Sequence, residues 1–138
     1  MKKKLMLVLL VCLLLVGCKG KNNLTCKGEE EVSGNTYKTE IKFKYKDNKV
    51  TKAKLIMTVT LNENVKLYDI YYNAFEQTFD EYKDQDGIKV EVKKIDNGYK
   101  AILDVDYEIF KGQIDMINSS LNKEQTKTYY ENLKLTCK

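Results

Sequence analysis

Hydrophobic and polar residues alternate with a period of two along residues 36–46 and again along 53–61. This alternation is typical of strands that bury one face and expose the other. A loop of three residues, 47–49, would bring the two buried faces into register, so we predict a first hairpin. The expected cross-strand pairs are Phe43 with Ala53 and Ile41 with Leu55.

The period changes to three or four residues between positions 65 and 85, which predicts an amphipathic helix. Gly87 stands just past its end, as is common after helices. We expect the aromatic stripe of this helix to pack against the sheet. The stripe consists of Tyr68, Tyr72, Phe75, Phe79 and Tyr82.

A second hairpin is predicted from residues 88–95 and 99–107, with Asn97-Gly98 as its two-residue turn. On the outer face, this register would place Lys89 opposite Asp106 and would oppose two carboxylates, Glu91 and Asp104. The expected buried pairs are Val92 with Leu103, Val90 with Val105 and Ile88 with Tyr107.

The remaining segments predict a first strand over residues 24–32 and a short last helix from Asn122 to Leu133, capped by Asn122. Residues 108–121 have helical spacing that Gly112 interrupts, so a helix is only weakly indicated there. The fold class is therefore α+β, a mostly antiparallel sheet covered by helix on one face, in a single domain over 24–138. The candidate packing residues of the last helix are Leu121, Tyr129, Tyr130 and Leu133.

The N-terminus has the pattern of an export signal. Residues 2–4 are lysines and 5–16 form an apolar run of 12 residues, whereas a membrane-spanning helix needs about 20. The run ends in Leu15-Val16-Gly17-Cys18, which resembles the lipobox of bacterial lipoproteins. We predict that residues 1–17 are removed as a signal peptide, that Cys18 receives a diacylglyceryl group, and that 18–23 form a lipidated tether. The alternatives are an ordinary secretory signal or a retained anchor.

Two cysteines remain after Cys12 is removed with the signal and Cys18 is lipidated. Cys26 and Cys137 lie near the two ends of the domain, in similar Leu-Thr-Cys-Lys contexts, and we predict a disulfide between two neighbouring extended segments. The bridge would close a loop of 110 intervening residues, to which the chain-entropy model assigns about 4–5 kcal/mol. A metal site or two free thiols are the alternatives.

The composition restricts the chemistry that is available. All 24 basic residues are lysines, and histidine and arginine are absent, so there is no imidazole base and no guanidinium clamp. After residues 1–17 are removed, 21 lysines face 20 acids, a balance unsuited to nucleic-acid binding. We expect no enzyme activity, no cofactor and no metal. The alternative is an envelope hydrolase that uses the surface carboxylates Glu91, Asp104 and Asp106.

A strip of lysines is predicted on the outer face of the first hairpin. It would suit contact with anionic lipid headgroups or wall polymers. The simpler interpretation is that outward strand positions need soluble side chains, and that lysine also protects sheet edges. The strip consists of Lys38, Lys42, Lys44 and Lys46, joined by Lys52 and Lys54.

The segment 45–52, the helix that follows it and the Asp86-Gly87-Ile88 opening of the second hairpin resemble the small YehR-like bacterial lipoproteins. The resemblance covers most of residues 36–107. It implies an α+β lipoprotein of unknown function and supplies no active-site residues.

The expected function is a non-catalytic binding or interaction module, lipid-anchored on the extracytoplasmic face of the bacterial cell membrane. The expected partners are the membrane, reached through the lipid on Cys18, the lipoprotein processing machinery, and an envelope protein or polymer. A purely structural, wall-associated protein fits the sequence equally well.

Overall fold

The computed structural model of the chain describes residues 22–61 and 67–138. The predicted signal peptide, Cys18 and most of the tether lie outside the described residues, as do the first positions of the predicted 65–85 helix. The elements are β1 (Asn23–Val32), β2 (Asn35–Lys46), β3 (Lys49–Thr60), α2 (Tyr68–Asp80), β4 (Ile88–Ile95), β5 (Gly98–Asp106), α3 (Lys123–Asn132) and β6 (Thr136–Cys137).

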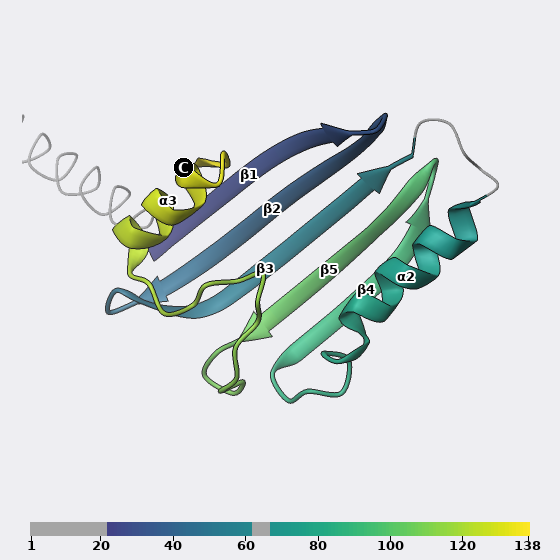
Figure 1. Cartoon of the computed structure of the whole chain (residues 1–138). Coiled ribbons are helices and arrows are strands. Elements are labelled where there is room, and N and C mark those ends of the chain that lie inside the picture. The colour runs from purple at the N-terminus through teal and green to yellow at the C-terminus, as the bar shows by residue number, and fades with distance from the viewer. Residues whose placement is uncertain (1–21, 62–66) are drawn as a thin grey trace, which may run out of the picture.

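The strands form one six-stranded sheet in the order β4-β5-β3-β2-β1-β6, and every neighbouring pair is antiparallel. Both helices lie on the same face of this sheet, α2 against β4 and β5, and α3 against β1 and β6 (Figure 1). The predicted α+β class is confirmed. In the described chain no helix is long and apolar enough to cross a membrane.

The first hairpin confirms the predicted pairs of Phe43 with Ala53 and of Ile41 with Leu55. Its turn differs from the predicted three-residue loop. Asp47 and Asn48, with φ of 51° and 61°, form a two-residue turn, and a bulge beyond Lys44 absorbs the extra residue. The buried faces of both strands are therefore aligned as expected.

The second hairpin corrects the predicted register by two residues. Ile88 pairs with Val105, and Val90 with Leu103, because the turn is Asp96-Asn97 rather than Asn97-Gly98. Gly98 begins β5 and is needed for a different reason. A Cβ there would lie 1.9 Å from the carbonyl oxygen of Val59 on the neighbouring strand. A shift of two preserves which face each side chain occupies, so the predicted inward and outward sets are unchanged.

The aromatic stripe of α2 packs on the sheet as predicted. Phe79 is 1% exposed, and the ring of Phe75 lies 4.6 Å from that of Tyr99 on β5. The hydroxyls of Tyr68 and Tyr72 donate to the backbone carbonyls of Gly98 and Val92. These hydrogen bonds satisfy the polar ends of the rings and fix α2 along the β4-β5 edge.

Residues 107–122 form an irregular crossing from β5 to α3 instead of the weakly indicated helix (Figure 1). Ile114 and Ile117 form an isolated bridge and are 3% and 2% exposed, so the crossing closes the core over the middle strands. The spacing that suggested a helix arises because Ile114 and Ile117, three residues apart, both point inward from a tight turn.

Helix α3 confirms the predicted cap. The side chain of Asn122 accepts from the backbone of Gln125, whose side chain accepts from the Asn122 backbone N–H, a reciprocal capping box. Tyr130 is buried as predicted, and Thr126 is fully buried, whereas Tyr129 and Leu133 are exposed. Their helical spacing alone therefore did not place those two side chains in the core.

The predicted disulfide joins Cys26 of β1 to Cys137 of β6, with their Cα atoms 4.0 Å apart. The flanking residues Thr25 and Lys138 exchange both backbone hydrogen bonds, each 2.8 Å long. Cys26 and Cys137 thus form a non-hydrogen-bonded pair, the position where antiparallel strands approach most closely. The bond ties the last segment of the chain to the start of the first strand.

Reducing this disulfide is expected to lower the melting temperature by about ten degrees or more, because the unfolded chain regains the freedom of a very long loop. Calorimetry with and without reductant measures the shift. A Cys26→Ser, Cys137→Ser double variant should melt like the reduced protein and should lose nothing further to reductant. Free alkylation of both thiols in the native protein would contradict the assignment.

Candidate functional site

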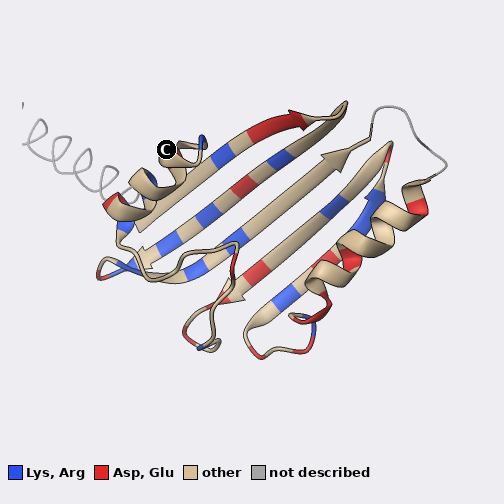
Figure 2. Ribbon diagram, viewed as in Figure 1, with Lys and Arg blue, Asp and Glu red and all other residues tan. Residues whose placement is uncertain are grey.

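The face of the sheet opposite α2 and α3 is covered by no other described element (Figure 1). Figure 2 marks the charged positions along the strands as blue and red bands. Because side chains alternate along each strand and the apolar set is buried under the helices, most of these charged side chains lie on the open face. It contains only a few apolar side chains, among them Ile56 and Ile102, which are opposite each other on β3 and β5. The open face is therefore a broad charged surface on a rigid support.

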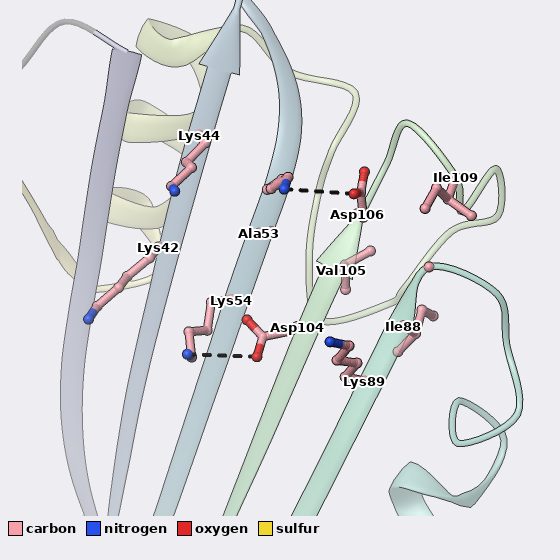
Figure 3. Close-up of a pocket in the computed structure, with 12 residues that line it drawn as sticks. Lys42, Lys44, Ala53, Lys54, Ile88, Lys89, Asp104, Val105, Asp106 and Ile109 are labelled. Carbon is pink, nitrogen blue, oxygen red and sulfur yellow. Dashed lines mark ion pairs between the residues drawn. The ribbon is translucent and has the colours of Figure 1, made fainter. Parts of the chain in front are cut away.

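A hollow of about 620 Å³ lies at one end of the open face, over β2, β3, β5 and β4. Gly87, Ile88 and Ile109 border it on one side, and Figure 3 labels the two isoleucines there. Its charged lining consists of Lys42, Lys44, Lys52, Lys54, Lys89, Asp104 and Asp106. Five lysines thus face two aspartates.

We call Lys42, Lys44, Lys52 and Lys54 the lysine quartet. Lys44 is directly opposite Lys52, and Lys42 is directly opposite Lys54. Like charges in such positions repel each other and weaken strand pairing. The fold therefore concentrates positive charge in the hollow at some cost in stability.

The two aspartates on β5 compensate for part of this charge. Lys52 lies 3.8 Å from Asp106, and Lys54 lies 3.7 Å from Asp104 (Figure 3). These side chains are between 29% and 56% exposed, so water screens both ion pairs. Among the described residues, Lys44 forms no ion pair, and neither does Lys89.

The far end of the open face has a different charge balance. A second hollow of about 490 Å³ is lined there by three lysines and two glutamates. Lys27 lies 3.8 Å from Glu40, and Lys38 lies 3.5 Å from Glu29. The excess of positive charge is therefore greatest in the hollow that holds the lysine quartet.

The sequence predicted the lysine strip of the first hairpin, and its outward placement is confirmed. Lys38, Lys42 and Lys44 lie on the open face of β2. Sequence reasoning missed Lys89 and Ile109 as neighbours of this strip, because they reach it through the long-range pairing of β3 with β5. A signal for that pairing exists in the sequence. Lys52 and Lys54 have the same two-residue spacing as Asp104 and Asp106, which suits two cross-strand ion pairs.

The predicted carboxylate pair is wrong. With the corrected register, Glu91 lies opposite Ile102, and Asp104 lies opposite Lys89. Glu91 instead forms an ion pair of 3.2 Å with Lys93 on its own strand. The direct opposition of Glu91 and Asp104, which would have raised one pKa toward that of a general acid, is absent from the described chain.

Two other titratable groups with raised pKa values, Tyr107 and Lys94, have structural roles. Burial raises the pKa of Tyr107 to about 12, so its phenol stays neutral at physiological pH. The hydrogen bond that Lys94 donates to the carboxylate of Asp69 raises the pKa of Lys94, whose ammonium also lies over the rings of Tyr68 and Tyr72. Within the part of the chain that the structure describes, no group of three or more histidine, cysteine, aspartate or glutamate residues is placed to hold a metal ion.

The repulsion in the lysine quartet predicts an unusual gain from a charge reversal. Lys44→Glu should raise the free energy of unfolding by about 0.5 kcal/mol, because it converts a lysine–lysine pair into an opposite-charge pair with Lys52. Urea unfolding measures the gain, which salt at about 1 M should remove. Lys52→Glu is the matched control: it places a carboxylate opposite Asp106 as well as Lys44 and should bring no comparable gain. Destabilisation by Lys44→Glu would contradict this account.

Comparison with known proteins does not place the chain in a family. The chain was compared with protein-family models, with curated proteins and with solved structures, and none of them matched. Its resemblance to the YehR-like lipoproteins therefore stays a prediction. The function has to be argued from the open face itself.

Proposed function

We propose that this chain is the precursor of a bacterial lipoprotein whose folded domain binds an acidic partner at the cell envelope through the open face of its sheet. In this proposal residues 1–17 are removed, and Cys18 carries a diacylglyceryl group that holds the domain on the extracytoplasmic face of the membrane. The resemblance to YehR-like lipoproteins supports the same location at the membrane. The observation that carries the binding role is the hollow lined by the lysine quartet.

Several features of the hollow favour binding. It is open to water, and its five ammonium groups come from three strands of one sheet, β2, β3 and β4. A surface of this kind recognises negative charge without the enclosed pocket that a small apolar ligand requires. The self-repulsion of the quartet would be relieved by an acidic partner, so its cost in stability has a functional explanation.

The alternative of a hydrolase has less support. In its best-argued form, a hydrolase using Glu91, Asp104 and Asp106 needed Glu91 and Asp104 to be directly opposed, and the strand register separates these two. Asp104 and Asp106 form exposed ion pairs with Lys54 and Lys52. Asp104 lies opposite a lysine on each neighbouring strand, Lys54 and Lys89, and not opposite a second carboxylate. We therefore infer a non-catalytic role.

Lipid attachment is tested by producing the full chain in a bacterial host supplied with a labelled fatty acid. The unchanged chain should carry the label, and Cys18→Ala should carry none and should accumulate as the uncleaved precursor. Cys12→Ala is the matched control, because that cysteine lies within the apolar run and should be dispensable for labelling. Unchanged labelling of Cys18→Ala would contradict the assignment.

The non-catalytic role is tested with purified protein on a panel of ester, peptide, glycoside and phosphate substrates. We expect no turnover. Any activity that Asp104→Asn retains in full is assigned to a contaminant, because this variant removes the carboxylate central to the hydrolase alternative. Turnover that disappears in Asp104→Asn would overturn the non-catalytic interpretation.

A further inference from the structure

The lysine quartet lies at the end of the sheet where the folded chain begins. Asn23, the first residue of β1, is directly opposite Lys44 on β2. Lys44 is in turn opposite Lys52, and Lys52 is opposite Asp106. A row of directly opposed residues on β1, β2, β3 and β5 therefore runs from the start of the domain to the hollow.

The sequence sets how far this end can lie from Cys18. Cys18 precedes Asn23 by five residues, and five extended residues span at most about 18 Å. The neighbouring strand adds about 5 Å. A lipid on Cys18 thus holds the backbone of Lys44 within about 23 Å of the bilayer surface.

We propose that the lysine quartet docks on the acidic phospholipid headgroups of the membrane that holds the Cys18 lipid; this inference rests on the proposed lipid anchoring. The group that the quartet would bind is a phosphate, and the phospholipid headgroup supplies it. Docking orients the sheet with the end that contains the quartet on the membrane and the opposite end directed away from it.

Charge complementarity carries the argument. Lysines near an anionic bilayer each strengthen attachment by about fivefold, and the repelling pairs Lys44–Lys52 and Lys42–Lys54 are relieved by the same negative charge. The far hollow, with three lysines against two glutamates, offers a weaker attraction than the quartet's hollow, with five lysines against two aspartates. Ile109, which is 58% exposed at the edge of the quartet's hollow, adds an apolar side chain where the headgroups would lie.

Attachment to the membrane cannot report this docking, because the lipid holds the protein on any bilayer. The experiment therefore uses the full lipidated protein in vesicles of phosphatidylcholine alone or mixed in equal parts with phosphatidylglycerol. Lysines are acetylated with a water-soluble reagent, and the rate at each site is read by mass spectrometry. We expect acetylation of Lys44 and Lys52 to slow about fivefold or more in the anionic vesicles, with Lys93 and Lys100 unchanged. Salt at about 1 M should abolish the protection, because the screening length falls to about 3 Å.

Two matched double variants test whether the quartet itself is responsible. Lys44→Gln, Lys52→Gln removes a directly opposed lysine pair at the quartet, and Lys93→Gln, Lys100→Gln removes another at the far end of the same face. In each pair one lysine is ion-paired, to Asp106 or to Glu91. The first variant should lose the protection of the remaining hollow lysines, and the second should keep it.

The outcomes separate this inference from the function on which it rests. Equal acetylation in both kinds of vesicle, on protein that carries the Cys18 lipid, would overturn headgroup docking and leave the lipoprotein assignment standing. Protection by inorganic phosphate in neutral vesicles, equal to that given by phosphatidylglycerol, would overturn it in favour of a soluble anion. Absence of lipid on Cys18, detected before reconstitution, would overturn both.

Discussion

The alternation of side chains across five long antiparallel strands is the constraint on which the rest of the structure depends. In the first hairpin it buries Phe43 and Leu55 and at the same time places Lys42 and Lys54 on the open face. A slip of one residue would exchange the two sets and bury ammonium groups, at a large cost in desolvation. The arrangement of charge on the open face is therefore fixed by the packing of the core.

Much of this fold could be predicted from local sequence signals. Alternation gave the register of the first hairpin, the aromatic stripe gave the packing face of α2, and Asn122 gave the start of α3. The second hairpin was predicted two residues out of register because Asn97-Gly98 has the composition of a tight turn. Gly98 is a glycine for another reason, its close approach to the Val59 carbonyl, which involves a strand 39 residues earlier in the sequence.

The candidate site was harder to predict, because several of its residues are brought to the first hairpin only by contacts between segments far apart in the sequence. The lysines of β2 and β3 are local to one hairpin, but Asp104 and Asp106 reach them only because β5 pairs with β3 across the intervening helix and strand. Ile109 and the crossing at 107–122 follow no simple period, since their inward residues are set by the surface they close. Periodicity describes regular elements, and the hollow lies partly between them.

The disulfide also determines how the domain bears mechanical load. A pull transmitted through the residues before Asn23 enters the sheet along β1 and reaches the covalent bond at Cys26 three residues later. From there the force divides between the β1-β2 ladder and the C-terminal segment, in which α3 packs on both β1 and β6. Separating β1 from β2 would require β6 and α3 to move together with β1. Tension from the N-terminal segment thus enters the domain at the end where the disulfide joins β1 to the C-terminal strand β6, and both strands carry the load.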